Sequence, residues 1–290
     1  MTLIMSKVVR NTYKNLIYGP INSQHSKRIQ IRKASTMIKT KFEGKIKQIT
    51  MCDLKTRNAL SINMMETLIK EITADQDFSN LRAIVISAEG PVFSAGHNLK
   101  ELKSELGKAQ YEKVFSLATK LMLSIINSPV PIIAKVDGLA AAAGCQLIAQ
   151  CDITICSEES QFSTPGANFG IFCSTPGIAL ARCVPKMVAL HMLLTGNPIS
   201  SKEAKESGLV SKVVSKDKLD EEVDKICNAI LLKSRSVIEL GKKFYYKQVQ
   251  TDIKNAYAMG ERQMVDNVGM KDGQEGILSF AEKRKPVWSS

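Results

Sequence analysis

Two short stretches of small residues combine with apolar runs in a pattern that can hold a negatively charged oxygen. Residues 93–99 follow the apolar run at 83–86, and residues 138–145 follow the apolar run at 131–136. Each stretch predicts a buried strand, then a turn of small residues, then the start of a helix. Small side chains let a ligand approach the backbone, and N–H groups at a helix start favour negative charge. Two such turns side by side provide two N–H donors for one oxyanion, as thioester chemistry requires.

The order of strands and helices that must position these turns indicates an α/β fold. Strands are expected at 45–51, 81–87, 130–136 and 152–156, and helices after the cap Ser61, at 109–127 and at 144–150. Because the middle strands are apolar on both faces, they predict a parallel sheet covered on both sides. From about residue 176 the pattern is helical, with helices expected at 185–196, 200–208, 219–232, 236–250, 252–268 and 273–285.

Most of the net charge of +12 lies at the start of the 290-residue chain. Residues 1–42 contain nine Lys or Arg and no acid, which leaves +3 for the rest. The Ser, Thr and Asn content, with no long apolar stretch, is typical of a mitochondrial transit peptide. The alternative is a basic arm that binds nucleic acid or a membrane surface. Nucleic acid is disfavoured because the other charges nearly balance and no aromatic stacking platform is evident.

The seven cysteines show neither a C-x-x-C pair nor the spacing of a zinc site. We therefore expect reduced thiols in apolar surroundings and no metal. A nucleophilic cysteine would need a histidine and a third orienting group, and the chain has only three histidines. No apolar run is long enough to span a bilayer.

Five segments together resemble the enoyl-CoA hydratase/isomerase (crotonase) superfamily, and they lie at 93–99, 138–145, 151–153, 162–165 and 195–200. The resemblance runs from about residue 43 to the end. It implies a spiral of ββα units with a helical C-terminal trimerisation region. The implied division is a leader at 1–42, a spiral core at 43–195 and a helical region at 196–290. Residues 172–177, 264–267 and 283–288 resemble one mitochondrial member in particular.

The resemblance also assigns a CoA thioester to the space between the two turns, with no other cofactor. The backbone N–H groups of His97 and Ala143 are the implied oxyanion donors. The family usually has glycine at position 143, and alanine keeps the N–H where its backbone angles allow. The implied substrate-binding positions are Lys55, Arg57, Ala59, Ala95, Gly96, Asn98, Leu99 and Gly144.

The assignment of Lys55 and Arg57, and that of a basic tail at 283–285, each have a structural alternative. Lys55 and Arg57 either meet the CoA phosphates, which favour such cations, or are solvated surface cations. The basic tail at 283–285 either reaches CoA on a neighbouring subunit or ends the last helix favourably. Asn98 is expected to fix its own loop, because short amides bond to nearby backbone.

The acid–base pair of the family's hydratases is missing from this sequence. One family glutamate follows the small-residue turn and another follows a Phe-x-x-Pro segment, and here Gln146 and Gly166 stand at those positions. Adding water to a double bond requires positioned groups that remove and deliver protons. Because an amide is no base near neutral pH and glycine has no side chain, we expect ordinary hydratase turnover to be absent or very weak.

Two functions remain open. One is a non-catalytic acyl-CoA binder in the fatty-acid metabolism of the mitochondrial matrix, assembled as a homotrimer or hexamer. The other is an acyl-CoA enzyme with altered chemistry, such as decarboxylation, isomerisation or thioester hydrolysis. The run Ser94-Ala95-Gly96-His97 also resembles acyl-CoA decarboxylases of the same superfamily. There the His97 side chain holds or transfers a proton, or else only its backbone matters.

Overall fold

Two sheets form the centre of the computed structural model, which describes residues 37–290. The first sheet has six strands, which in spatial order are β1 (Ile38–Glu43), β2 (Ile46–Met51), β3 (Ala83–Ala88), β5 (Ile132–Val136), β7 (Ile153–Ser157) and β10 (Lys212–Val214). Its strands pair in parallel except at the β1–β2 hairpin. The second sheet has four strands, in the order β4 (Val92–Ser94), β6 (Leu139–Ala141), β8 (Gln161–Ser163) and β9 (Ile199–Ser200).

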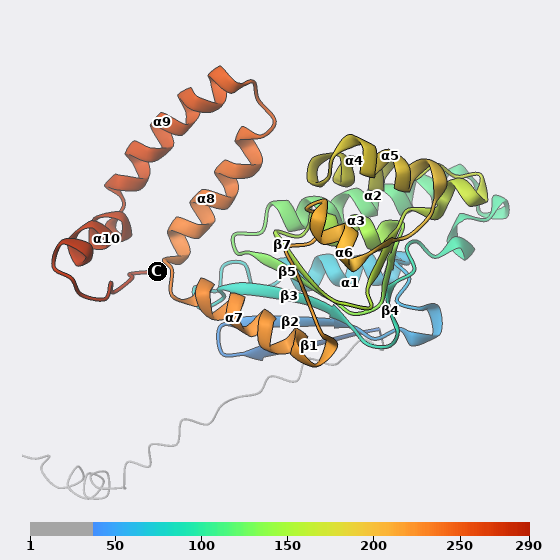
Figure 1. Cartoon of the computed structure of the whole chain (residues 1–290), viewed down its shortest axis with the longest axis horizontal. Coiled ribbons are helices and arrows are strands. Elements are labelled where there is room, and N and C mark those ends of the chain that lie inside the picture. The colour runs from blue at the N-terminus through green and yellow to red at the C-terminus, as the bar shows by residue number, and fades with distance from the viewer. Residues whose placement is uncertain (1–36) are drawn as a thin grey trace, which may run out of the picture. The chain divides into compact units, whose positions relative to one another are not determined.

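Successive units of two strands and a helix link these sheets (Figure 1). The units are β3–β4 with α2 (Gly107–Ile126), β5–β6 with α3 (Ala143–Gln150), and β7–β8 with α4 (Ser174–Cys183) and α5 (Lys186–Thr195). In each unit the first strand joins the six-stranded sheet and the second joins the four-stranded sheet. The expected α/β spiral of ββα units is therefore confirmed.

Both faces of the six-stranded sheet are buried, as the apolar strands predict. In β3, Ile84 and Ile86 face a cluster built with α1 (Ile62–Thr73) and α2. The alternate residues Ala83 and Val85 face α7 (Leu219–Leu231). A strand with helices on each face must be apolar at every position, which is why these strands show no polar alternation.

The expected helix boundaries hold where a cap defines them. The Ser61 side chain accepts the Met64 N–H at 3.2 Å and begins α1. Ser200 and Glu203 form a reciprocal capping box at the start of α6 (Ser201–Glu206). Gly196, at φ 69°, ends α5 in the left-handed conformation that glycine adopts most easily. Short 3-10 helices are η1 (Leu54–Thr56), η2 (Leu99–Leu102), η3 (Ser104–Leu106), η4 (Pro165–Phe169) and η5 (Lys216–Lys218).

The folded body begins before Glu43, so the expected boundary of the leader at residue 42 is too late. Residues 38–43 form β1, which pairs with β2 around a turn at Gly44, φ 62°. Of the β1 residues only Ile38 is buried, and the others are exposed and mostly polar. Because β1 is mostly polar and basic, its composition does not distinguish it from a basic leader. Residues 1–36 of the expected leader lie outside the described residues.

The expected boundary at residue 195 also differs from the structure. After it, β9 pairs with β8 and β10 pairs with β7, so both strands extend the core sheets. Helix α7 then covers one face of the six-stranded sheet. The described residues form one compact unit, with no division near residue 195. The purely helical part is shorter than expected and consists of α8 (Arg235–Gln248), α9 (Ile253–Gly269) and α10 (Lys271–Ala281).

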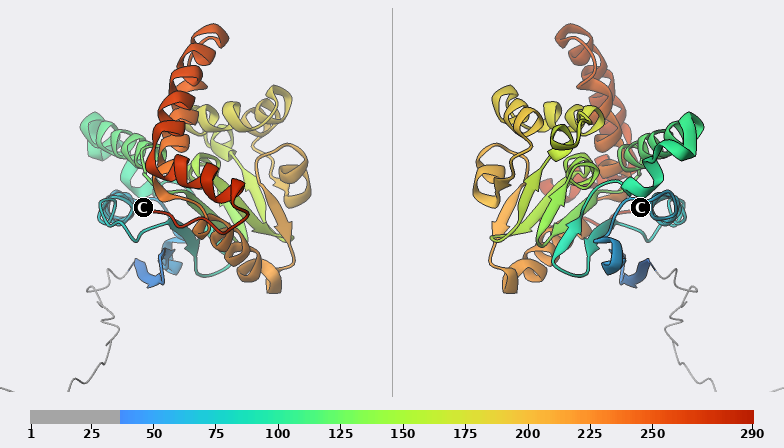
Figure 2. Two further views of the ribbon diagram at one scale, coloured as in Figure 1. Left: turned by 90° about the vertical axis from the view of Figure 1, so that its left-hand side faces the viewer. Right: turned by 90° about the vertical axis from the view of Figure 1, so that its right-hand side faces the viewer.

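We call these three helices the C-terminal arm. Figures 1 and 2 show α9 and α10 lying away from the two sheets, whereas α8 reaches back to them. In the described part of the chain, no helix is both long and apolar enough to cross a membrane.

A buried charge attaches α8 to the core. Lys242, 8% exposed, donates to Asp152 Oδ2 at 2.7 Å and to the backbone oxygens of Ile125 and Val130 at 2.9 and 3.0 Å. The Tyr246 hydroxyl donates to the other Asp152 oxygen at 3.0 Å. Because each charge has several partners, the pair is tolerated away from water.

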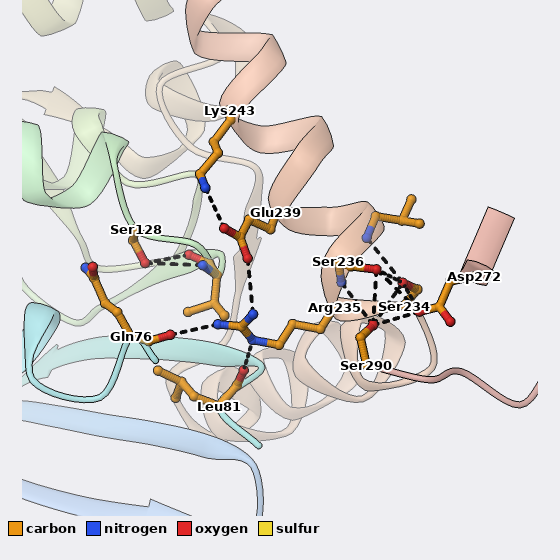
Figure 3. Close-up of polar contacts among 12 residues, drawn as sticks. Gln76, Leu81, Ser128, Ser234, Arg235, Ser236, Glu239, Lys243, Asp272 and Ser290 are labelled. Carbon is orange, nitrogen blue, oxygen red and sulfur yellow. Dashed lines mark hydrogen bonds and ion pairs between the residues drawn. The ribbon is translucent and has the colours of Figure 1, made fainter. Parts of the chain in front are cut away.

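Arg235 makes the second attachment, shown in Figure 3. Its guanidinium donates to the backbone oxygens of Gln76 at 2.8 Å and Leu81 at 3.1 Å, and it pairs with Glu239 at 3.1 Å. At the start of α8, Asp272 accepts hydrogen bonds from Ser234 and Ser290 at 2.6 and 2.7 Å. The arm is thus joined to the core by α8, and the C-terminal tail is bonded to the arm.

Replacing Lys242 tests the buried attachment. Lys242→Met removes the cation and leaves the Asp152 carboxylate without its charged partner. Breaking a buried ion pair in this way costs about 3–5 kcal/mol of unfolding free energy. Urea denaturation measures the loss. The control is Lys243→Met, because Lys243 pairs with Glu239 at the surface, where such a pair contributes about 0–1 kcal/mol. Equal effects of the two variants would contradict the assignment.

Candidate active site

The four-stranded sheet brings the candidate residues to one edge. Strands β4, β6 and β8 are parallel neighbours, so their carboxyl ends lie at the same edge of the sheet. Gly96 and His97 follow β4, Ala143 and Gln146 follow β6, and Gly166 follows β8. The structure therefore gathers the residues that the sequence singles out for chemistry.

The Gly96 turn lies directly against the start of α3. An ideal Cβ on Gly96 would be 2.8 Å from the Ala142 Cβ and 3.3 Å from the Ala143 nitrogen. Gly96 also has φ +90°, which L side chains rarely adopt. Both observations require glycine here, and they place the two turns in contact, as the oxyanion hypothesis needs.

Two hydrogen bonds orient the proposed oxyanion donors. The Gly96 carbonyl accepts the Leu60 N–H at 2.7 Å, and the Ala142 carbonyl accepts the Gln146 N–H at 3.0 Å. In a trans peptide the C=O and N–H point in opposite directions, so the His97 and Ala143 N–H groups point away from these partners. Within residues 37–290 neither N–H donates a hydrogen bond.

Close packing and local strain hold the Ala143 donor in place. Ala142 has φ 48° and ψ −117°, an unusual conformation for a residue with a Cβ, and its N–H donates to the Ser163 oxygen at 2.9 Å. An ideal Cβ on Gly144 would be 2.7 Å from the Ser94 Cβ, so β4 and α3 meet without intervening side chains. Strain of this kind persists where the surroundings over-determine the backbone. Nothing in the sequence signals this role of Ala142 beyond its place in a run of alanines.

The His97 ring is turned into the protein. Its Nδ1 lies 3.4 Å from the Leu60 oxygen, and the ring meets Phe115 edge-on, with centroids 5.5 Å apart. Its Nε2 is enclosed and has no hydrogen-bond partner. Burial lowers the pKa of His97, so the ring is neutral at neutral pH. This geometry favours the backbone role of His97 over proton transfer by its side chain.

The positions of the two missing glutamates differ in the room they offer. Gln146 is buried, and its Oε1 has no hydrogen-bond partner. At Gly166 an ideal Cβ would be 2.1 Å from the Ile171 oxygen and 2.6 Å from the Cys173 Sγ. The space of a side chain at position 166 is therefore already occupied. Sequence reasoning did not single out Cys173, and nothing in the sequence signals this contact.

The seven cysteines all lie within residues 37–290 and none is in a disulfide, as expected. Burial raises the pKa of Cys145 to about 12. Burial also raises the pKa of Cys173, although the Gly166 N–H opposes this by bonding to its sulfur. Thiols with raised pKa values remain protonated at neutral pH and are poor nucleophiles.

The loop after η1 adjoins the Gly96 turn. The side chains of Lys55 and Arg57 are exposed, and the Arg57 carbonyl accepts the Ala95 N–H at 3.0 Å. Ala59, in contrast, is buried. Asn58, which the sequence analysis did not consider, is fully buried, and its amide donates to the oxygens of Glu89 and Val92, both at 2.9 Å. Its φ of 54° is one that asparagine tolerates better than most residues.

Two other predicted positions have local roles. The Asn98 side chain accepts the Lys100 N–H at 3.2 Å and caps η2, in line with the expectation that it fixes its loop. Leu99 is exposed. In the basic tail, Arg284 pairs with Glu275 at 2.6 Å and with Glu282 at 2.6 Å. For Arg284 this favours the interpretation that the tail fixes the end of α10.

Comparisons with known proteins give one consistent result. A family model described as enoyl-CoA hydratase/isomerase matches residues 41–290. The human enoyl-CoA hydratase domain-containing protein 3, mitochondrial, is 54% identical over 244 residues, which cover 84% of this chain and 80% of that protein. Its counterpart from Danio rerio is 46% identical over 257 residues, 89% of each chain. This is the member that residues 172–177, 264–267 and 283–288 resemble, so the more specific resemblance is confirmed.

Solved structures agree with this result. The crystal structure of the human protein covers 87% of this chain and 100% of its own, with a TM-score of 0.85 at 51% identity. An enoyl-CoA hydratase from Mycobacterium smegmatis covers 88% of this chain and 99% of its own, with a TM-score of 0.85 at 38% identity.

Substitutions at Gly96 and His97 distinguish the role of the backbone N–H groups in ligand binding from the role of the His97 ring. Gly96→Ala places a methyl against Ala142 and the Ala143 nitrogen, so we expect butyryl-CoA to bind about tenfold more weakly, as the loss of one or two hydrogen bonds implies. His97→Ala keeps the backbone N–H, so affinity should change by less than about threefold. Calorimetric titration measures both. A larger loss in His97→Ala than in Gly96→Ala would assign the role to the ring.

Proposed function

Because the chain belongs to the enoyl-CoA hydratase/isomerase family, we propose that it binds acyl-CoA thioesters in fatty-acid metabolism without ordinary hydratase turnover. The thioester carbonyl accepts hydrogen bonds from the N–H groups of His97 and Ala143. Contact between their two turns, and the outward direction of both N–H groups, support this assignment. The 3′-phosphate and pyrophosphate of CoA lie near Lys55 and Arg57, whose exposed loop adjoins Ala95.

The observation that carries the proposed loss of hydration is the occupied space at Gly166. Hydration requires one group to take a proton from water and another to deliver a proton to carbon. The Ile171 carbonyl and the Cys173 thiol leave no room for a carboxylate at position 166, and Gln146 is an amide. Carbonyl polarisation therefore remains possible, whereas the proton transfers have no carboxylate at either position.

The proposed location is the mitochondrial matrix. The relatives that resemble this chain at 46–54% identity are named mitochondrial. The acid-free basic composition of residues 1–42 agrees with import.

A second candidate is an acyl-CoA enzyme with altered chemistry, favoured by the intact pair of donors. Stabilising an oxyanion assists any step that forms an enolate or a tetrahedral species. Decarboxylation, isomerisation and thioester hydrolysis all include such a step. Incubating residues 37–290 with a panel of acyl-CoAs that includes malonyl-type thioesters separates this candidate from a pure binder. Product formation that Gly96→Ala abolishes would establish turnover at this site.

We also propose that the C-terminal arm joins three copies of the chain, or two such trimers. Helices α9 and α10 carry exposed apolar side chains at Ile253, Tyr257, Met264, Val265, Ile277 and Phe280. Large apolar side chains exposed together on helices that lie away from the core indicate a surface through which copies of the chain associate.

Hydration of crotonyl-CoA tests the main proposal. We expect its rate to fall at least about 10⁴-fold below that of an ordinary family hydratase, because two acid–base groups contribute about 10²–10⁴-fold each. Loss of the enoyl absorbance measures the rate. Gln146→Glu alone should not restore turnover, since position 166 still lacks a carboxylate. A wild-type rate close to that of ordinary hydratases would contradict the proposal.

Light scattering after size exclusion tests the proposed assembly. We expect three or six times the mass of one chain. Val265→Asp, which places a charge on the exposed face of α9, should give smaller species because a buried charge without a partner is costly. The control is Phe78→Asp, which changes an exposed aromatic outside the arm. A single-chain mass for the unaltered protein would contradict the proposal.

A further inference from the structure

We propose that the groove between helices α8 and α9 is a second ligand site, which binds a nucleotide through its phosphates and its base. The groove has a volume of about 450 Å³, which is within the range of small-molecule sites. Three basic side chains line it, two from α8 and one from α9, namely Lys243, Lys247 and Arg262. This inference goes beyond the proposed function, because no residue of the groove belongs to the carbonyl site.

The groove lies on the side of α8 that faces away from the core. Lys242 and Tyr246 bond to Asp152 on the other side of this helix. Residues two positions apart on an α-helix point about 160° apart, so Phe244 points away from both Lys242 and Tyr246. The Phe244 ring packs against α9 instead, where an ideal Cβ on Gly260 would lie 3.4 Å from its Cζ. Figures 1 and 2 show α8 and α9 side by side on the arm.

On α9 the groove and the exposed apolar surface lie on opposite sides of the helix. Met259, Arg262 and Asp266 line the groove at positions i, i+3 and i+7, which share one face of a helix. Tyr257 and Met264, which belong to the proposed contact between copies, are each two positions from a groove residue and so point about 160° away from it. A contact through that apolar surface therefore leaves the groove open.

Two of the three cations in the groove have no acidic partner. Lys243 shares the carboxylate of Glu239 with Arg235, as Figure 3 shows. Across the described residues 37–290, the side-chain nitrogens of Lys247 and Arg262 make no hydrogen bond or ion pair. Lys243 and Lys247 are also four positions apart on one helix, where like charges repel. A bound anion would neutralise this charge and relieve the repulsion.

The remaining lining residues indicate what kind of anion fits. Asp266 is the one acidic residue of the lining, so three basic side chains leave a net charge of +2, which suits an anion with two or more charges. Phe244 provides a ring on which a base stacks, and Met259 a thioether that contacts aromatic rings favourably. Because Phe244 is the single aromatic residue of the lining, the groove accommodates one base rather than a stretch of nucleic acid.

Calorimetric titration of the full chain with ADP tests the inference. The titration is run with and without saturating butyryl-CoA, and we expect one ADP per chain to bind in both cases. Adenosine, which lacks the phosphates, should bind at least about tenfold more weakly than ADP, since it loses the charge-assisted hydrogen bonds. Inorganic phosphate has no base to stack on Phe244 and should bind at least about fivefold more weakly than ADP.

Four variants locate the ligand. Arg262→Gln and Lys247→Gln should each weaken ADP binding about tenfold, because each removes a charged donor to phosphate, while the affinity for butyryl-CoA stays unchanged. Phe244→Leu should weaken ADP binding at least about fivefold and leave the affinity for inorganic phosphate unchanged. The matched control is Lys186→Gln, which removes one positive charge from an exposed position at the start of α5, outside the groove. Its affinity for ADP should equal that of the unaltered protein.

Each contrary result has a distinct meaning. Failure of ADP to bind, or an equal loss of affinity in Lys186→Gln and Arg262→Gln, overturns this inference and leaves the proposed function standing. Displacement of ADP by butyryl-CoA, or loss of affinity for both in Arg262→Gln, assigns the groove to the CoA site and overturns a separate nucleotide site.

Two further outcomes complete the test. Binding to phosphatidylglycerol vesicles that Arg262→Gln weakens, without any binding of ADP, assigns the groove to a lipid headgroup and overturns the inference. Binding of ADP that Arg262→Gln weakens, in a protein that does not bind butyryl-CoA, supports the inference and removes the proposed function.

Discussion

The contact between the Gly96 turn and the first residues of α3 is the constraint on which the rest of the site depends. It needs no Cβ at position 96, a small one at position 142 and none at position 144, where Ser94 lies close. Parallel pairing of β4 with β6 brings the two segments to the same edge. The Gly96 and Ala142 carbonyls are bound inside the fold, so the His97 and Ala143 N–H groups each point away from the partner of the carbonyl in the same peptide.

Main-chain donors and side-chain acids respond differently to substitution. Replacing glycine by alanine at position 143 leaves the N–H in place, whereas replacing glutamate by glutamine or glycine removes a base completely. This chain departs from the hydratase pattern at both kinds of position, at Ala143 and at Gln146 and Gly166. Under the proposed function, these departures remove proton transfer and keep the means of binding a carbonyl. That combination is expected of a family member used for recognition, or for a reaction that starts without a strong base.

The sequence predicted the elements whose burial is unambiguous. Strands β3, β5 and β7 are apolar at nearly every position because helices cover both faces, and capped helices began where Ser61 and Ser200 stand. Strand β1 was missed because only one of its six residues is buried. The three-residue strands of the second sheet are too short to show a period. The positive φ of Ala142 could not be predicted, because the surrounding contacts impose it against the preference of alanine.

The occupied space at Gly166 bears on how this chain can change over generations. A glutamine codon becomes a glutamate codon by one nucleotide change, so position 146 is open to a carboxylate in one step. Position 166 is not, since any side chain there meets the Ile171 carbonyl unless the backbone of that loop moves first. Mutations elsewhere in the loop must precede the one that matters, and selection for hydration cannot favour them in advance. The loop thus makes a carboxylate at position 166 depend on an earlier change in its own backbone.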